Sequence, residues 1–218
     1  MPRIFIGFLM ILLMVLIMGC GAANVPVSEP EQVAPSINRA DAACLGDENA
    51  PVQVVLFSDF ECPFCKGAAI DLERAHKDYP DKIRICYRYF PLRYHSQALN
   101  AAKAAEAAHL QGKFWEMHDK LFANNTELSD DIYLRLATEI GLDIDRFQKD
   151  MNSPQVADKV SADKLEGKEL GVEGTPYVFM NYPRFGEPYR FWGFYSNLPI
   201  SIYDIIKKTG LIRPDHTK

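Results

Sequence analysis

Two cysteines separated by two residues are the part of this sequence best suited to chemistry. Cys62-Pro63-Phe64-Cys65 follows a short apolar run and precedes a stretch with helical spacing. Proline is favoured in the first turn of a helix, so Cys62 is expected at a helix N-terminus. Free N–H groups and the helix dipole there favour a thiolate and lower its pKa. The pattern predicts a redox dithiol in which Cys62 exchanges with a substrate sulfur and Cys65 resolves the mixed disulfide.

Other functions of a C-x-x-C pair fit the sequence less well. A zinc site needs two further ligands, and without a second C-x-x-C or a closely spaced histidine pair it would have to recruit Cys44 and Cys86. A purely structural bridge between Cys62 and Cys65 would close too short a loop to remove much chain entropy. The sequence has no G-x-G-x-x-G motif and no P-loop, and we expect neither a cofactor nor a metal. Phe64, between the cysteines, is expected to meet the substrate.

The elements that must position the dithiol form two halves separated by helices. Apolar or alternating runs predict strands at residues 52–57, 83–90, 177–180 and 190–194. Spaced apolar positions and turn residues predict helices at residues 62–79, 96–110, 114–122, 129–140, 143–151, 154–170 and 199–209. The order is β-α-β, then a helical block, then β-β-α, which predicts one α/β domain with a helical insertion.

Several segments resemble DsbA-like thioredoxin-fold oxidoreductases, in the same order along the chain. They are Phe57–Lys66 around the dithiol, Tyr89–Leu92 with His95, Gln111–His118, and Leu170–Pro176. The resemblance covers residues 45–209 and implies a thioredoxin-like fold with its helical insertion at about residues 96–171. It further implies a cis Thr175–Pro176 bond beside the dithiol, so that both residues support the active site.

One position departs from the pattern of this family. Thioredoxin-fold enzymes usually carry a buried Asp or Glu six residues before the first cysteine, and Leu56 occupies that position here. The group that moves a proton to or from Cys65 is therefore missing from its usual place. Asp59 and Glu61 are candidate replacements, although both are interpreted more simply as solvated turn residues. We expect an acidic Cys62 and a slowly deprotonating Cys65.

The first twenty residues predict export. Arg3 precedes an apolar run at residues 4–18, which is typical of a secretory signal. Gly19 before Cys20 resembles the lipobox of bacterial lipoproteins, in which the cysteine is acylated and becomes the N-terminus. Met18 is larger than the residue usually found there. A signal cleaved without lipidation and an uncleaved anchor are the alternatives.

The chain is thus divided into four parts. We expect a lipoprotein signal at residues 1–19, a flexible tether at 20–43, the DsbA-like domain at 44–210, and a tail at 211–218. With Cys20 lipidated, four cysteines remain, and this even number permits a structural disulfide between Cys44 and Cys86. A thiol in a strand is nevertheless more often a buried apolar filler than a bridge partner.

The sequence and the resemblance favour an exported thiol–disulfide oxidoreductase. A net charge of −5 argues against nucleic-acid binding. Export favours the oxidation of cysteine-containing exported proteins, with an implied membrane quinone-linked partner that reoxidises the dithiol. We expect a monomer, held by its lipid at the periplasmic or extracytoplasmic side of a bacterial membrane. A reductase for a specific exported client, a peptide-binding chaperone and a metal carrier on the same fold are the alternatives.

Overall fold

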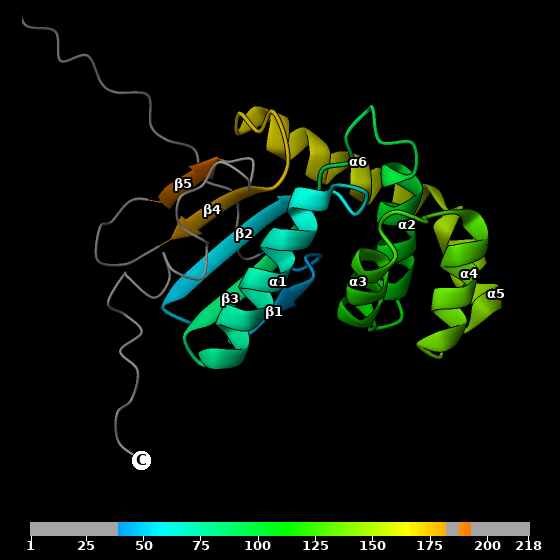
Figure 1. Ribbon diagram of the computed structural model, residues 1–218, viewed down its shortest axis with the longest axis horizontal. Coiled ribbons are helices and arrows are strands. Elements are labelled where there is room, and N and C mark those ends of the chain that lie inside the picture. The colour runs from blue at the N-terminus through cyan, green and yellow to red at the C-terminus, as the bar shows by residue number, and fades with distance from the viewer. Residues whose placement is uncertain (1–38, 182–187, 193–218) are drawn as a thin grey trace, which may run out of the picture. The chain divides into compact units, whose positions relative to one another are not determined.

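A mixed β-sheet carries the predicted dithiol segment. The computed structural model describes residues 39–181 and 188–192, which lie in one compact unit of the chain. Within these ranges the strand order is β1-β3-β2-β4-β5 (Figure 1). β2 and β3 are parallel, and the other neighbouring pairs are antiparallel. The strands are β1 (Cys44–Leu45), β2 (Val52–Ser58), β3 (Ile83–Tyr89), β4 (Tyr177–Asn181) and β5 (Pro188–Trp192).

The helices of the described residues follow the predicted order. α1 joins the two parallel strands, and α2 to α6 make up the insertion between β3 and β4 (Figure 1). The α/β fold with a thioredoxin-like sheet and a helical insertion is therefore confirmed. The helices are α1 (Pro63–Asp78), α2 (Ala98–His109), α3 (Phe114–Ala123), α4 (Asp130–Glu139), α5 (Ile144–Met151) and α6 (Pro154–Glu169).

The central strand β2 is buried on both faces of the sheet. Val54 and Leu56 belong to a large apolar cluster that also contains the inner side of α1. Val55 and Phe57 belong to a second cluster on the opposite face. Helices cover both faces of parallel strands, so such strands are almost continuously apolar, as this run is. On the second face, α6 packs closely against the ring of Phe90 at Gly167. A Cβ atom at this position would lie only 2.8 Å from the ring.

Helix α1 begins at the dithiol. Cys62 is the N-cap residue in an extended conformation, and Pro63 occupies the first turn. Cys65, Ala68, Leu72 and Ala75 are buried at helical spacing, which fixes this side of α1 against the sheet. The helix ends at Tyr79, whose N–H donates to the carbonyl of Ala75 at 3.0 Å. The predicted helix at residues 62–79 is confirmed to within one residue at each end.

Residues 39–43, assigned to the tether by their composition, contact the domain. Arg39 pairs with Asp163 at 2.9 Å and with Glu166 at 2.7 Å. Ala43 is buried, and its carbonyl accepts a hydrogen bond from the N–H of Tyr87 at 2.9 Å. The part of the tether prediction that covers residues 39–43 is wrong. Composition did not reveal this packing, because the partner of Arg39, Glu166, lies 127 positions further along the chain.

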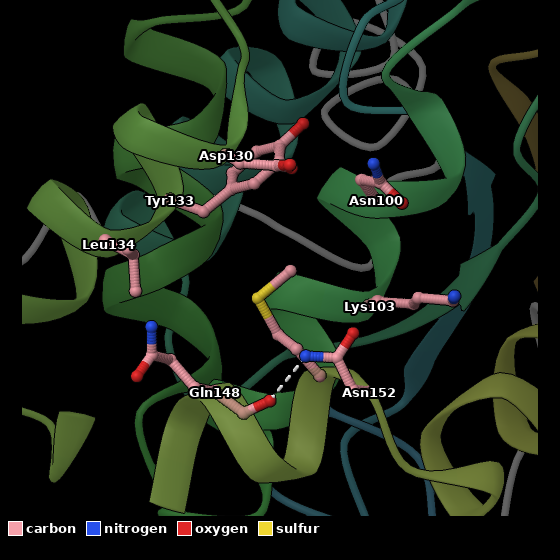
Figure 2. A pocket seen from close by; sticks show the side chains of 8 residues that line it. Asn100, Lys103, Asp130, Tyr133, Leu134, Gln148 and Asn152 are labelled. Carbon is pink, nitrogen blue, oxygen red and sulfur yellow. Dashed lines mark hydrogen bonds between the residues drawn. The ribbon is translucent and has the colours of Figure 1, made fainter. Parts of the chain in front are cut away.

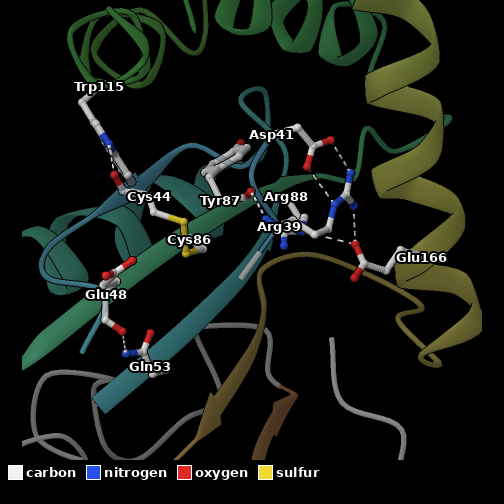
Figure 3. Close-up of a disulfide and its surroundings, with 10 residues drawn as sticks. All are labelled: Arg39, Asp41, Cys44, Glu48, Gln53, Cys86, Tyr87, Arg88, Trp115 and Glu166. Carbon is white, nitrogen blue, oxygen red and sulfur yellow. Dashed lines mark hydrogen bonds and ion pairs between the residues drawn. A yellow bond between two sulfur atoms is a disulfide. The ribbon is translucent and has the colours of Figure 1, made fainter. Parts of the chain in front are cut away.

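A short strand that the sequence did not predict follows this segment. β1 pairs with β3 in a register that sets Cys44 opposite Cys86. The two cysteines form a disulfide with an S–S distance of 2.04 Å (Figure 3). The position of Cys86 in a strand favoured a free buried thiol. That expectation is wrong, because the adjacent strand β1 places Cys44 directly opposite Cys86.

Some predicted features lie outside the described residues. They are the signal at residues 1–19 with the lipidation site Cys20, the tether up to residue 38, the helix at 199–209 and the tail at 211–218. Among the residues that are described, no helix combines the length and the apolar character needed to cross a membrane.

Candidate active site

The two cysteines of the C-x-x-C segment lie where β2 leads into α1. Cys62 caps the helix and Cys65 sits in its first turn. Both are free thiols, so the structure shows the dithiol form. Cys62 is 3% exposed and Cys65 is fully buried, an order that suits an outer attacking sulfur and an inner resolving sulfur.

The pKa values of the two thiols are shifted in opposite directions. The pKa of Cys62 falls to about 6, chiefly because of its interaction with the Cys65 thiol. The backbone N–H groups of Cys65 and Phe64 and the Thr175 hydroxyl lower it further, against the effect of burial. Burial, followed by the interaction with Cys62, raises the pKa of Cys65 well above its ordinary value. A thiolate on Cys62 and a proton kept on Cys65 are therefore favoured near neutral pH.

The loop before β4 completes this arrangement. The Thr175–Pro176 peptide bond is cis, as the resemblance implies. The Cys62 Sγ donates to the Thr175 carbonyl oxygen at 3.6 Å. Thr175 and Pro176 are both buried, whereas Pro63 is exposed and Phe64 is half-buried against the large cluster. The structure thus brings Cys62, Cys65 and the Thr175–Pro176 loop together.

Asp59 has a more central position than a solvated turn residue would have. It is 2% exposed, and its carboxylate accepts hydrogen bonds from the N–H groups of Glu61 and Leu92, both at 2.8 Å. His95 Nδ1 lies 2.9 Å from the same carboxylate. The backbone N–H of Asp59 donates to Cys65 Sγ at 3.4 Å. The interpretation of Asp59 as a solvated residue is wrong, because Leu92 and His95, which enclose its carboxylate, lie in a loop more than thirty positions away.

Glu61 is also tied to the protein. It is half-buried and accepts a hydrogen bond from the N–H of Gln97 at 2.6 Å, just before α2. The turn between β2 and the dithiol is therefore anchored to the following loops by both of its acidic side chains.

Tyr94 is an exposed aromatic residue that the sequence did not single out. It is 74% exposed and packs edge-on against His95, with ring centroids 4.7 Å apart. Partial burial and then the negative charges of Cys62 and Asp59 raise its pKa, which places it within electrostatic range of the dithiol. In the sequence, only the position of Tyr94 next to His95, in a segment that resembles the family, could have pointed to it as a site residue.

A separate pocket lies in the helical insertion. It measures about 280 Å³ and is lined by residues of α2, α4 and α5 together with Asn152 (Figure 2). Lys103, Asp130 and Tyr133 give it a mixed polar lining, and no residue of the C-x-x-C segment or of the Thr175–Pro176 loop contributes.

The arrangement of the cysteines disfavours the zinc alternative. Cys44 and Cys86, the additional ligands it required, are joined to each other. Cys86 belongs to the cluster on the face of the sheet opposite to that of Cys62 and Cys65. Within residues 39–181 and 188–192, no group of three or more Cys, His, Asp or Glu side chains is arranged to hold a metal ion.

Comparison with protein families and curated proteins gives consistent matches. The family model described as Thioredoxin matches residues 39–196. The chain is 40% identical over 149 residues to Na⁺/H⁺ antiporter NhaA 1 of Mycolicibacterium vanbaalenii, a match that covers 66% of this chain and 24% of the antiporter. It is 41% identical over 146 residues to Na⁺/H⁺ antiporter NhaA 3 of Salinispora tropica, covering 66% and 22%. The chain therefore spans about a quarter of the length of these curated relatives.

Solved structures show the same fold. A thioredoxin-like oxidoreductase from Silicibacter pomeroyi is 29% identical, with a TM-score of 0.61 over 73% of this chain and 89% of that one. The thiol-disulfide exchange protein alpha-DsbA2 from Wolbachia pipientis is 24% identical, with a TM-score of 0.64 over 79% and 89%. BdbD from Bacillus subtilis is 24% identical, with a TM-score of 0.63 over 80% and 92%.

Proposed function

Because this chain belongs to the thioredoxin family and shares its fold with DsbA-type proteins, we propose that it is a thiol–disulfide oxidoreductase that acts through Cys62 and Cys65. An oxidoreductase is among its solved relatives. The observation that carries the proposal is the placement of two free thiols at one helix start beside the Thr175–Pro176 loop, and their opposite pKa shifts support it. Such a pair supplies one reactive thiolate and one thiol held in reserve.

The preferred direction is the oxidation of client thiols. A client thiolate attacks Cys62 in the Cys62–Cys65 disulfide, and the Cys65 sulfur leaves with the electron pair of the broken bond. A second client thiolate then attacks the client sulfur of the mixed disulfide, and Cys62 leaves as a thiolate. The low pKa of Cys62 supports this direction, because a stabilised thiolate favours the reduced enzyme and makes the disulfide a stronger oxidant.

Clients are cysteine-containing proteins in an extended conformation at the cysteine. The Thr175–Pro176 loop lies beside Cys62, and Tyr94 offers an exposed aromatic ring near it. We propose that the loop pairs with the client backbone and that Tyr94 and Phe64 add apolar contact.

The enzyme works as a monomer outside the cytoplasm, anchored by a lipid on Cys20. The signal-like run at residues 4–18 and the Gly19-Cys20 pair support export and lipidation. The Cys44–Cys86 disulfide also supports an oxidising compartment, where such bonds persist. A membrane quinone-linked partner would then restore the Cys62–Cys65 disulfide. The transport activity named for the antiporter relatives belongs to proteins of which this chain matches about a quarter, and the proposal concerns the matching domain alone.

The test is the reduction potential of the Cys62–Cys65 pair together with turnover on a dithiol peptide. A potential near about −120 mV supports an oxidase, and one near about −270 mV supports the reductase alternative. We expect Cys62→Ala to abolish exchange. The Cys65→Ala protein should stop at a mixed disulfide when it is given the disulfide form of the same peptide, whose second sulfur leaves as a thiol. A wild-type protein that binds the peptide without exchanging disulfides would overturn the proposal in favour of a chaperone.

A further inference from the structure

Cys65 has to lose a proton in a place where the usual base is missing. Leu56 occupies the position of the buried carboxylate and is 1% exposed. Cys65 itself is fully buried, which disfavours its thiolate. In the proposed oxidation the Cys65 sulfur leaves as a thiolate, and in the reverse, resolving step the same sulfur acts as a nucleophile. In both directions another group has to stabilise the negative charge on Cys65.

Three buried hydroxyl groups lie at the dithiol. Ser58 is 1% exposed, Tyr87 is 2% and Thr175 is 3%. None of these hydroxyl oxygens has a hydrogen-bond partner within the part of the chain that the structure describes. Unsatisfied buried polar groups are uncommon in proteins and require an explanation, and a redox or catalytic role is one of the accepted explanations.

Ser58 is the neighbour in sequence of the backbone group that contacts the second sulfur. It ends β2 on the same face as Leu56, and the next residue, Asp59, donates its N–H to Cys65 Sγ at 3.4 Å. A polar interaction with the Ser58 hydroxyl opposes the effect of burial on the pKa of Cys65. A polar interaction with the same hydroxyl also lowers the pKa of Tyr87, against the larger effect of burial there. The Ser58 hydroxyl is therefore within reach of both the Cys65 thiol and the Tyr87 hydroxyl, although it is hydrogen-bonded to neither in the structure.

Tyr87 is fixed in position by aromatic neighbours. Its Cα pairs with that of Leu56 in the β2–β3 register, so it stands beside the missing carboxylate. Its ring stacks on Phe60 with centroids 5.2 Å apart and meets Phe114 at 5.2 Å and His118 at 5.6 Å. Ring packing of this kind leaves the hydroxyl little freedom to turn away.

We propose that the Ser58 hydroxyl, confined beside the Tyr87 ring, donates a hydrogen bond to the Cys65 thiolate as it forms and so takes the place of the carboxylate absent at Leu56. The inference rests on the proposed function. Ser58 is the catalytic residue because it contacts a reacting sulfur, and Tyr87 is a positioning residue that acts through Ser58. Because the serine hydroxyl has no other partner among the described residues, the bond to sulfur is gained chiefly when charge develops, which accelerates the step.

The step is balanced without any further reagent. In the mixed disulfide, Cys62 Sγ is bonded to a client sulfur. Cys65 loses its proton, its sulfur attacks Cys62 Sγ, and the bond between Cys62 and the client sulfur breaks. The client sulfur leaves with the electron pair of the broken bond and takes up, in net balance, the proton that Cys65 lost. Cys62 and Cys65 become oxidised to a disulfide, and the client is reduced. This step is the reverse of the first step of client oxidation, so a group that stabilises the Cys65 thiolate accelerates both directions.

A small aromatic disulfide that releases a coloured thiol separates the two chemical steps. Reduced protein mixed with it in a stopped-flow instrument should release one equivalent when Cys62 attacks and a second when Cys65 resolves the adduct. We expect Ser58→Ala to leave the first phase unchanged within about twofold and to slow the second about tenfold, the value of a hydrogen bond to a charged group. The pH dependence of the second phase should move to higher pH. Tyr87→Phe should have the same effect with a smaller size, about threefold.

Two further variants control the experiment. Tyr89→Phe removes a buried hydroxyl on the same strand, but this hydroxyl donates to Glu106 at 2.9 Å, so both phases should keep their wild-type rates. Ser58→Thr keeps a hydroxyl at the sulfur and should restore the second phase. Thermal unfolding of each variant identifies a loss that is only structural.

The outcomes separate this inference from the proposed function. A wild-type protein that never releases the first equivalent would overturn the function itself. A wild type with both phases, together with Ser58→Ala and Tyr87→Phe proteins whose second phase stays within about twofold of it at every pH, would overturn the role of the hydroxyls alone. A stable, folded Ser58→Thr protein that is as slow as Ser58→Ala would also overturn it.

Discussion

The carbonyl oxygen of Thr175 lies 3.6 Å from the sulfur of Cys62, across 113 positions of sequence. The contact joins the first helix after β2 to the loop that enters β4, two neighbouring strands of the sheet. A client paired with this loop would therefore present its sulfur to Cys62 directly. An interaction with Thr175 is also one of the causes that lower the pKa of Cys62.

The titration of Cys62 should report its dependence on Cys65. In the wild type we expect the thiolate to form with a midpoint near pH 6, followed by its ultraviolet absorbance. In Cys65→Ala the midpoint should rise, because the interaction with the Cys65 thiol is the largest cause of the low pKa. A double variant, Cys44→Ala with Cys86→Ala, is the control and should titrate like the wild type. Equal midpoints in the wild type and in Cys65→Ala would contradict this account of the acidity.

Loss of the Asp59 carboxylate should destabilise the fold. Asp59→Ala leaves the buried N–H groups of Glu61 and Leu92 without their acceptor and removes the partner of His95. We expect the free energy of unfolding to fall by about 3 kcal/mol, measured by urea denaturation.

A second carboxylate–histidine pair provides the matched control. Asp119 lies 2.8 Å from His118 Nδ1, but its side chain is 62% exposed. Asp119→Ala should reduce the free energy of unfolding by less than about 1 kcal/mol. Similar losses in the two variants would show that burial does not determine how much Asp59 contributes to the free energy of unfolding.

The sequence predicted those parts of the site that depend on neighbouring residues. Cys62 at a helix start follows from Pro63 and the apolar run before it, and both are local signals. The sheet and the helical insertion follow from periodicity, because each element buries one side against the same core. The cis bond at Thr175 came from family resemblance, since an isolated X–Pro bond is usually trans.

The rest depends on contacts between distant segments, which the local sequence pattern does not reveal. Asp59 has the composition of a turn residue, and only the loop that carries Leu92 and His95 makes it a buried acceptor. Ser58 ends an apolar strand, and its relation to Cys65 depends on how α1 lies over the sheet. The pairing of Cys44 with Cys86 needed the register of a two-residue strand, which is too short to show any periodicity.

The Cys44–Cys86 disulfide should stabilise the domain without taking part in exchange. It links residues 42 positions apart, and a loop of this length corresponds to about 4 kcal/mol in the chain-entropy model. The double variant Cys44→Ala with Cys86→Ala should lose up to this amount in the free energy of unfolding, measured by urea denaturation. Its exchange rate should stay close to that of the wild type, because Cys86 and the dithiol belong to clusters on opposite faces. Loss of exchange in a folded double variant would contradict this separation.

The stability of the fold should depend on pH through Glu106. This side chain is 6% exposed and accepts a hydrogen bond from the Tyr89 hydroxyl at 2.9 Å. Burial raises the pKa of Glu106 from an ordinary value of 4.5 to about 7. Between these two values the folded protein keeps a proton on Glu106, while the unfolded chain has lost it. Because the unfolded state binds fewer protons there, the contribution of Glu106 to the free energy of unfolding falls as the pH rises.

Comparison with Glu106→Gln isolates this effect from other titrating groups. Glutamine is neutral and its amide oxygen still accepts a hydrogen bond from Tyr89, so the variant should lack the decline. Relative to the wild type, we expect it to gain roughly 3 kcal/mol between about pH 4 and pH 8, measured by urea denaturation across that range. Glu116→Gln, which changes an exposed carboxylate on α3, should show no such gain. If the difference between Glu106→Gln and the wild type stays constant with pH, Glu106 is ionised in the folded protein throughout, and Lys159 rather than burial controls its charge.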